Sequence, residues 1–112
     1  QVSDLGQLVE RLGDPTPTER PVNLFGGYHA VGDEALEAIF EVIPDLPLNS
    51  LVPAPYRSEW EEIGAGAYYK YVRADPANRI QFREAVRTWI AEATPKQRES
   101  WGQQKWIPIE GY

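Results

Sequence analysis

Apolar residues recur at helical spacing in two stretches of the N-terminal half. Between Ser3 and Gly13 they follow an i, i+3, i+4, i+7 pattern, which predicts a short helix that ends at Gly13. Asp33 stands where a helix N-cap is expected, and Pro44 is expected to end the helix that follows. The predicted apolar faces consist of Leu5, Leu8, Val9 and Leu12 in the first helix and of Leu36, Ile39, Phe40 and Ile43 in the second.

Three helix-start signals follow one another in the C-terminal half. They are the capping-box pairs Ser58/Glu61 and Thr94/Gln97 and the N-cap and first-turn pair Asp75-Pro76. We therefore expect helices over residues 59–74, from residue 76 onward, and after residue 94. The positions expected to face the core are Trp60, Ile63, Gly64, Ala67, Tyr71 and Ala74 in the first of these helices and Phe82, Val86, Trp89, Ile90 and Ala93 in the second.

Prolines separate these helices and predict irregular connections. Residues 14–21 contain three prolines, so the capping-box spacing of Thr16 and Glu19 is expected to give one helical turn at most, within a loop. Residues 44–55 contain four prolines but are rich in leucine and valine, which favours an ordered crossover lying against the core. In residues 106–112 a proline again excludes a helix, so an extended apolar tail is predicted.

These patterns predict an all-α fold. The chain has 112 residues, of which 42% are hydrophobic, enough for one core that buries about 60 to 70% of the surface of the unfolded chain. We expect a small irregular bundle of four or five short helices over residues 1–105, with proline-rich ordered connections, and an extended aromatic tail over residues 106–112. The chain contains no cysteine, which excludes disulfides, thiolate metal sites and a cysteine nucleophile.

Composition also bears on location and origin. No apolar run approaches the roughly 18 residues of a membrane span, and no signal-peptide pattern is present, so a soluble cytoplasmic protein is expected. The chain begins at Gln1 rather than methionine, which leaves open a trimmed N-terminus. Arginine outnumbers lysine eight to three, and alanine, glycine and proline are frequent, a usage that favours a bacterial or phage origin.

The formal charge of −6 is unevenly distributed. Residues 1–54 carry two basic and nine acidic side chains, whereas residues 55–112 carry nine basic and eight acidic ones. The acidic half either attracts a cationic partner or packs against the arginines of the other half. The sequence alone leaves both readings open.

Candidate catalytic chemistry is sparse. His29 is the single histidine, so histidine metal pairs are excluded and one candidate general base remains. It lies in the loop Phe25-Gly26-Gly27-Tyr28-His29, which lacks the Gly-Lys-Ser/Thr ending of a phosphate-binding loop. This loop is the candidate small-molecule site, and the alternative is a structural loop with a hydrogen-bonded histidine. We assign no catalytic residue, metal or cofactor, and an enzyme is the less favoured class.

Arg79, Arg83 and Arg87 are spaced four residues apart and form a candidate charged stripe. Such a stripe can contact nucleic acid or an acidic protein surface, or its long side chains can cover the core and pair with acids. The sequence pI of about 4.7 opposes nucleic-acid binding, which is therefore the least favoured of the three.

The favoured prediction of function, binding to another protein, is based on the aromatic residues. Four tryptophans, six tyrosines and three phenylalanines are more than the predicted core needs, and aromatic side chains are favoured at interfaces. The candidate partner-binding residues are Tyr69, Trp101, Trp106, Ile107, Ile109 and Tyr112. The sequence thus predicts a protein–protein interaction module, as an adaptor, an inhibitor or a small subunit of a bacterial or phage assembly, whose partner is another protein or a second copy. The alternative for the tail is that it folds back onto its own domain.

Overall fold

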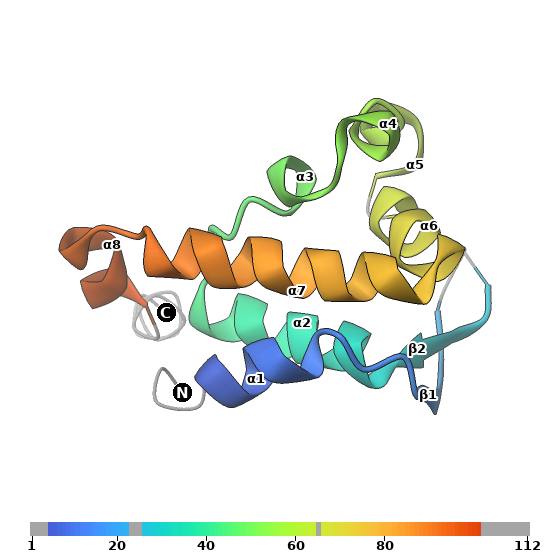
Figure 1. Ribbon diagram of the computed structural model, residues 1–112, viewed down its shortest axis with the longest axis horizontal. Helices are drawn as coiled ribbons and strands as arrows, with labels where there is room; N and C mark the ends of the chain where they lie inside the picture. Colours follow the sequence, from blue (N-terminus) through green and yellow to red (C-terminus); the bar gives the residue numbers. More distant parts are fainter. Residues whose placement is uncertain (1–4, 23–25, 65, 102–112) are drawn as a thin grey trace, which may run out of the picture.

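Helix α7 (Pro76–Ala91) runs through the middle of the fold, and Asp75 is its N-cap residue (Figure 1). The Asp75 carboxylate accepts a hydrogen bond from the Ala77 amide at 2.8 Å, and Pro76 occupies the first turn, as predicted. This computed structural model describes residues 5–22, 26–64 and 66–101, apart from the side chains of Glu61 and Glu62. The predicted tail over residues 106–112 and Ser3, at the start of the first predicted helix, lie outside the described residues.

Helices α1 (Leu5–Arg11) and α2 (Val31–Val42) pack against each other, and α1 also contacts α7. The predicted apolar faces are confirmed. Leu5, Val9, Leu12, Leu36, Ile39 and Ile43 are buried, and Leu8 and Phe40 are partly buried against them. The start of α2 differs from the prediction. Ala30 is the N-cap residue, and Asp33 lies in the first turn, where its carboxylate accepts the Ala30 amide at 2.8 Å.

The predicted helix over residues 59–74 is wrong as a single element. It is divided into α5 (Trp60–Ile63) and α6 (Gly66–Ala74), and the chain turns at Gly64 with φ of 51°. Ser58 is not the N-cap of α5, which is Glu59; it is the C-cap residue of α4 (Ala54–Arg57), and its hydroxyl donates to the Pro55 carbonyl at 3.0 Å.

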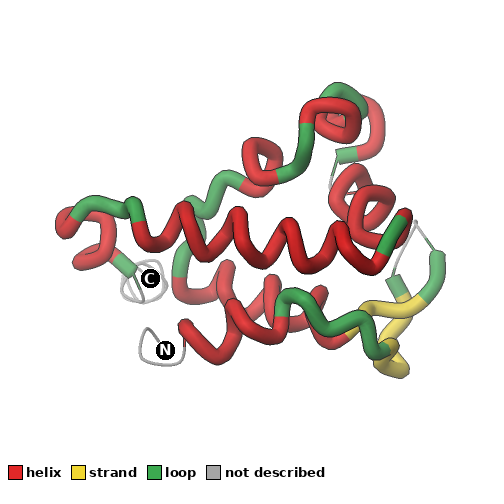
Figure 2. Tube along the Cα trace, in the orientation of Figure 1, coloured by secondary structure: helices red, strands yellow, loops and turns green. Residues whose placement is uncertain are grey.

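A β-hairpin replaces the loop predicted between α1 and α2, so the all-α prediction is corrected to a mostly helical fold with one small antiparallel hairpin (Figure 2). Strand β1 (Pro17–Pro21) pairs with β2 (Tyr28–Ala30), with Pro17 opposite Ala30 and Pro21 opposite Tyr28. The Thr18 hydroxyl donates to the His29 carbonyl at 2.8 Å, which ties the strands together. The proline-rich segment is therefore extended rather than helical.

The crossover between α2 and α5 is ordered and lies against the core, as predicted. Leu46 and Val52 are buried within it. Two helical turns that were not predicted, α3 (Leu48–Leu51) and α4, form inside it, and they contact α7 and α6 respectively.

Helix α8 (Pro95–Ser100) follows α7 after a short turn. Its predicted capping box is confirmed: the Gln97 amide donates to the Thr94 hydroxyl at 3.1 Å, and the Thr94 amide donates to the Gln97 side chain at 2.8 Å. Most of the buried apolar side chains form one cluster, with contributions from α1, α2, α6, α7, the crossover and Trp101. No helix in the described part of the chain is long and apolar enough to cross a lipid bilayer.

Candidate binding groove

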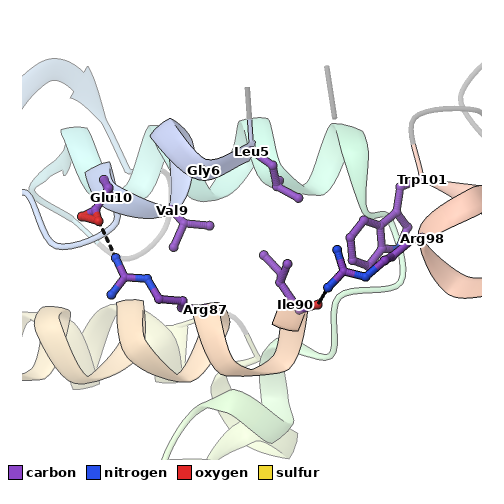
Figure 3. A pocket seen from close by; sticks show the side chains of 8 residues that line it. All are labelled: Leu5, Gly6, Val9, Glu10, Arg87, Ile90, Arg98 and Trp101. Atoms are coloured by element: carbon purple, nitrogen blue, oxygen red, sulfur yellow. Dashed lines mark hydrogen bonds and ion pairs between the residues drawn. The ribbon is translucent and has the colours of Figure 1, made fainter. Parts of the chain in front are cut away.

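A hollow of about 410 Å³ lies where α1, α7 and α8 meet (Figure 3). We call it the α1/α7/α8 groove. Its lining residues are Leu5, Gly6, Val9 and Glu10 from α1, Arg87 and Ile90 from α7, and Arg98 and Trp101 from α8 and its C-terminal cap. Its volume lies within the range of about 300 to 1,000 Å³ that is usual for binding pockets.

The apolar part of the groove follows from the helical pattern of the sequence. Leu5 and Val9 belong to the buried stripe of α1, and Ile90 belongs to that of α7 but remains half-buried. Between them, Gly6 supplies no side chain, and a Cβ atom placed there would meet no atom within 4 Å. The absence of a side chain at this position keeps the groove open beside the aliphatic residues.

The charged edge of the groove contains two arginines in different surroundings. Arg87 donates to Glu10 at 2.5 Å and to Glu84 at 2.6 Å, so it is neutralised by carboxylates. Arg98 instead donates to the Ile90 carbonyl at 2.6 Å, and its guanidinium lies over the Trp101 ring at 5.6 Å from the centroid. Within the described residues no carboxylate lies within ion-pairing distance of Arg98.

Trp101 was predicted to be an exposed partner-binding residue, and this placement is wrong. Only 3% of its surface is exposed, and its ring stacks on Trp89 with a centroid distance of 6.1 Å. Its Nε1 atom is buried and has no hydrogen-bond acceptor among the described residues. Trp101 therefore forms part of the wall of the groove and part of the core.

Tyr69, another candidate partner residue, is half-buried rather than fully exposed. Its hydroxyl lies 3.4 Å from His29 Nδ1, and the Arg73 guanidinium lies over its ring at 5.4 Å. Burial raises the pKa of Tyr69 above its ordinary value. This side chain packs the hairpin against α6, which limits how far it can contribute to a separate binding surface.

Of the candidate ligand loop, Gly26 and Gly27 lie between the two strands of the hairpin, Tyr28 and His29 belong to β2, and Phe25 lies outside the described residues. Arg73 donates to the Gly26 carbonyl at 2.9 Å and to the Tyr28 carbonyl at 3.3 Å. Gly27 has φ of 70°, and a Cβ there would lie 3.0 Å from Arg73 Nη1. His29 is buried, whereas Tyr28 is exposed. The described part of the loop is thus packed against α6 through Arg73.

The three arginines of the predicted stripe lie in different surroundings. Arg79 is 5% exposed and lies in the interior, so the prediction that it belongs to a surface stripe is wrong. Arg83 donates to Glu84 at 2.9 Å, and Arg87 to the same carboxylate and to Glu10. These pairs and the Arg79–Asp33 pair join basic residues of the C-terminal half to acidic residues of both halves. They favour the reading in which the two halves pack against each other.

Arg79 is held by the buried carboxylate of Asp33. Arg79 Nη1 donates to Asp33 Oδ1 at 2.9 Å, and the Tyr68 hydroxyl donates to the same oxygen at 2.7 Å. Burial opposes ionisation of Asp33, but the hydrogen bonds from Arg79, the Ala30 amide and Tyr68 outweigh it and lower its pKa. Burial, with the nearby Asp33 charge, raises the pKa of Tyr68 well above its ordinary value. This network joins α2, α6 and α7, and it is satisfied within the protein.

The groove residues Gly6, Glu10 and Arg98 were not predicted as site residues. The pattern of α1 contained a weak signal, because Gly6 is a small residue directly beside a buried stripe, but the groove requires three elements to meet. No group of three or more metal-ligating side chains occurs among the residues described here. No protein-family model matches the chain, and neither the curated proteins nor the solved structures contain a match to it.

Proposed function

We propose that this protein is a protein–protein interaction module that uses the α1/α7/α8 groove as its receiving surface and the apolar segment 106–112 as an anchor. The observation that carries the proposal is the groove itself, with an aliphatic floor, an open position at Gly6 and a charged edge. Hydrophobic anchors that enter a pocket of this kind, ringed by polar side chains, are the usual source of binding energy at interfaces.

The anchor is proposed from the sequence. Trp106, Ile107, Ile109 and Tyr112 give the segment a high density of residues that favour interfaces. Tyr69 and Trp101 no longer serve as exposed anchors in this proposal, because both are engaged in packing within their own chain. Their role is to fix the hairpin and the wall of the groove.

The test compares two substitutions of Gly6 in a tagged full-length chain expressed in its native host. Gly6→Ala adds a methyl group that meets no atom within 4 Å, whereas Gly6→Phe is designed to fill the groove that Gly6 lines. We expect the wild type and Gly6→Ala to retain the same copurifying protein, counted by quantitative mass spectrometry, and Gly6→Phe to lose it. Deletion of residues 106–112 should also lose it while helical circular dichroism is unchanged.

Both substitutions replace a glycine within α1 by a better helix former, so neither is expected to weaken the fold. Thermal melting of each variant checks this expectation. If all four forms of the chain retain the same proteins in the same amounts, the groove is not the binding surface and the proposal fails.

A further inference from the structure

The groove presents two chemical requirements to an occupant. Its aliphatic floor, made by Leu5, Val9 and Ile90, requires apolar side chains that can be withdrawn from water. Its edge contains the Arg98 guanidinium, which no carboxylate of the described residues neutralises, whereas Arg87 is held by Glu10 and Glu84. A matching segment therefore carries aliphatic side chains next to a carboxylate.

The chain itself contains a segment of this chemistry, Ile107-Pro108-Ile109-Glu110. We propose that this segment of a second copy binds in the groove, with the isoleucines on the aliphatic floor and Glu110 beside Arg98, and that the two copies exchange segments reciprocally. This inference rests on the proposed function and names the partner as another molecule of the same chain. Apolar contact supplies the affinity, and the charge pair fixes the direction of the segment.

Trp101 lines the groove and is also the last described residue before the segment, so the chain leaves the described part of the structure beside the groove (Figure 3). From Trp101 to Ile107 the chain spans at most about 20 Å when extended. Two copies whose grooves face each other can bridge that distance in both directions, which closes a twofold dimer instead of an open chain.

The first measurement is the mass of the full-length chain by sedimentation equilibrium, from about 1 µM to about 1 mM, which covers weak protein affinities. We expect a concentration-dependent dimer for the wild type and for Gly6→Ala, and a monomer for Gly6→Phe. Removal of one buried isoleucine contact, by Ile109→Ser, should weaken the dimer by on the order of tenfold or more. A wild-type chain that remains monomeric, or a dimer that is unaffected by Gly6→Phe, would overturn the inference.

The second measurement reverses the charge pair in two separate full-length chains, Glu110→Lys and Arg98→Glu. Each variant alone brings like charges together in both contacts, so each dimer should be weakened roughly tenfold. In an equal mixture, the segment of the Glu110→Lys chain meets the groove of the Arg98→Glu chain, which brings opposite charges together. The unsubstituted segment of the Arg98→Glu chain meets the unsubstituted groove of the Glu110→Lys chain, as in the wild type. The mixture should therefore recover the wild-type dimer affinity.

Recovery on mixing cannot arise from a segment bound to its own groove, nor from a variant that fails to fold. Absence of recovery, with both variants folded by circular dichroism, would contradict exchange between copies. The proposed function can fail or hold independently of this inference. If the purified wild-type chain is monomeric and Gly6→Phe loses a copurifying protein other than the chain itself, the groove is an interaction site. Its occupant is then not a second copy.

Discussion

Arg79→Met would leave the buried Asp33 carboxylate without its counter-charge. Asp33 is 2% exposed and Arg79 5%, and Asp33 would retain hydrogen bonds only from Tyr68 and from the Ala30 amide. Removal of one partner of a buried ion pair costs about 3 to 5 kcal/mol. Since domains of this size are stable by only about 5 to 15 kcal/mol, we expect a large loss of the free energy of unfolding at pH 7.

The pH dependence of this loss has a defined sign. In the wild type the folded pKa of Asp33 lies below its ordinary value of 3.8, so its contribution is present above that pH and is lost as the pH falls through the folded pKa. In Arg79→Met, burial without a counter-charge raises the folded pKa of Asp33. Its proton then stabilises the folded state, so the variant gains stability relative to the wild type as the pH falls toward 4.

The assay is urea unfolding followed by tryptophan fluorescence at pH 7 and at about pH 4, with free energies from linear extrapolation. The double variant Asp33→Asn/Arg79→Met is the control, because it removes both charges and keeps a side-chain oxygen near Tyr68. We expect the double variant to be more stable than Arg79→Met at pH 7 and the difference to shrink in acid. A cost of Arg79→Met below about 1 kcal/mol at pH 7, or equal pH dependence of the two variants, would refute the reasoning.

Three further predictions concern stability and are checked by the same unfolding assay. Gly32→Ala should cost about 2 kcal/mol or more, because the new Cβ would lie 2.4 Å from the Leu12 carbonyl oxygen; a cost near zero would contradict this close approach. Trp101→Phe should cost about 1 kcal/mol or less, since its Nε1 has no acceptor among the described residues, whereas Trp101→Ala should cost about 3 to 5 kcal/mol. Thr94→Ala should cost about 1 kcal/mol through loss of the cap to Gln97, and no change would argue against that cap.

The helices that the sequence predicts correctly depend on local signals. The caps at Asp75 and Thr94 form as predicted, and the stripes of α1, α2 and α7 are buried or packed against the core, because a cap or a stripe involves residues within a few turns of one another. The helix predicted over residues 59–74 is divided by the turn at Gly64, a residue predicted to lie on the apolar face of that helix. The sequence does not separate the two cases, because glycine occurs both within helices and in turns.

The misplaced residues depend on contacts that are distant in sequence. Arg79 was predicted at the surface because helical spacing cannot show that Asp33, 46 residues away, neutralises it in the interior. The hairpin was missed because its two strands are short and its first strand begins and ends with proline, so pairing outweighs local preference. Trp101 was assigned to the surface because its burial requires α8 to turn back toward α1.

The groove could not be predicted either, because it also depends on contacts between residues that are distant in sequence. Its floor residues were each predicted to face a core, and the hollow beside them forms at Gly6, where three elements meet. The predicted excess of aromatic residues at the surface is not seen among the described residues, where Tyr28 is the one exposed aromatic side chain. The proposed anchor in residues 106–112 stays a prediction. The proposed function thus combines a surface found in the structure with a segment found in the sequence.

Site-specific photo-crosslinking in the native host tests the central proposal most directly. A benzoylphenylalanine at Glu10, on the groove edge, is compared with one at Glu37 on α2, since each is an exposed glutamate paired with an arginine. The groove proposal predicts a protein adduct at position 10 that Gly6→Phe removes, and no such adduct at position 37. Equal adducts at both positions, or an adduct at position 10 that persists in Gly6→Phe, would contradict it.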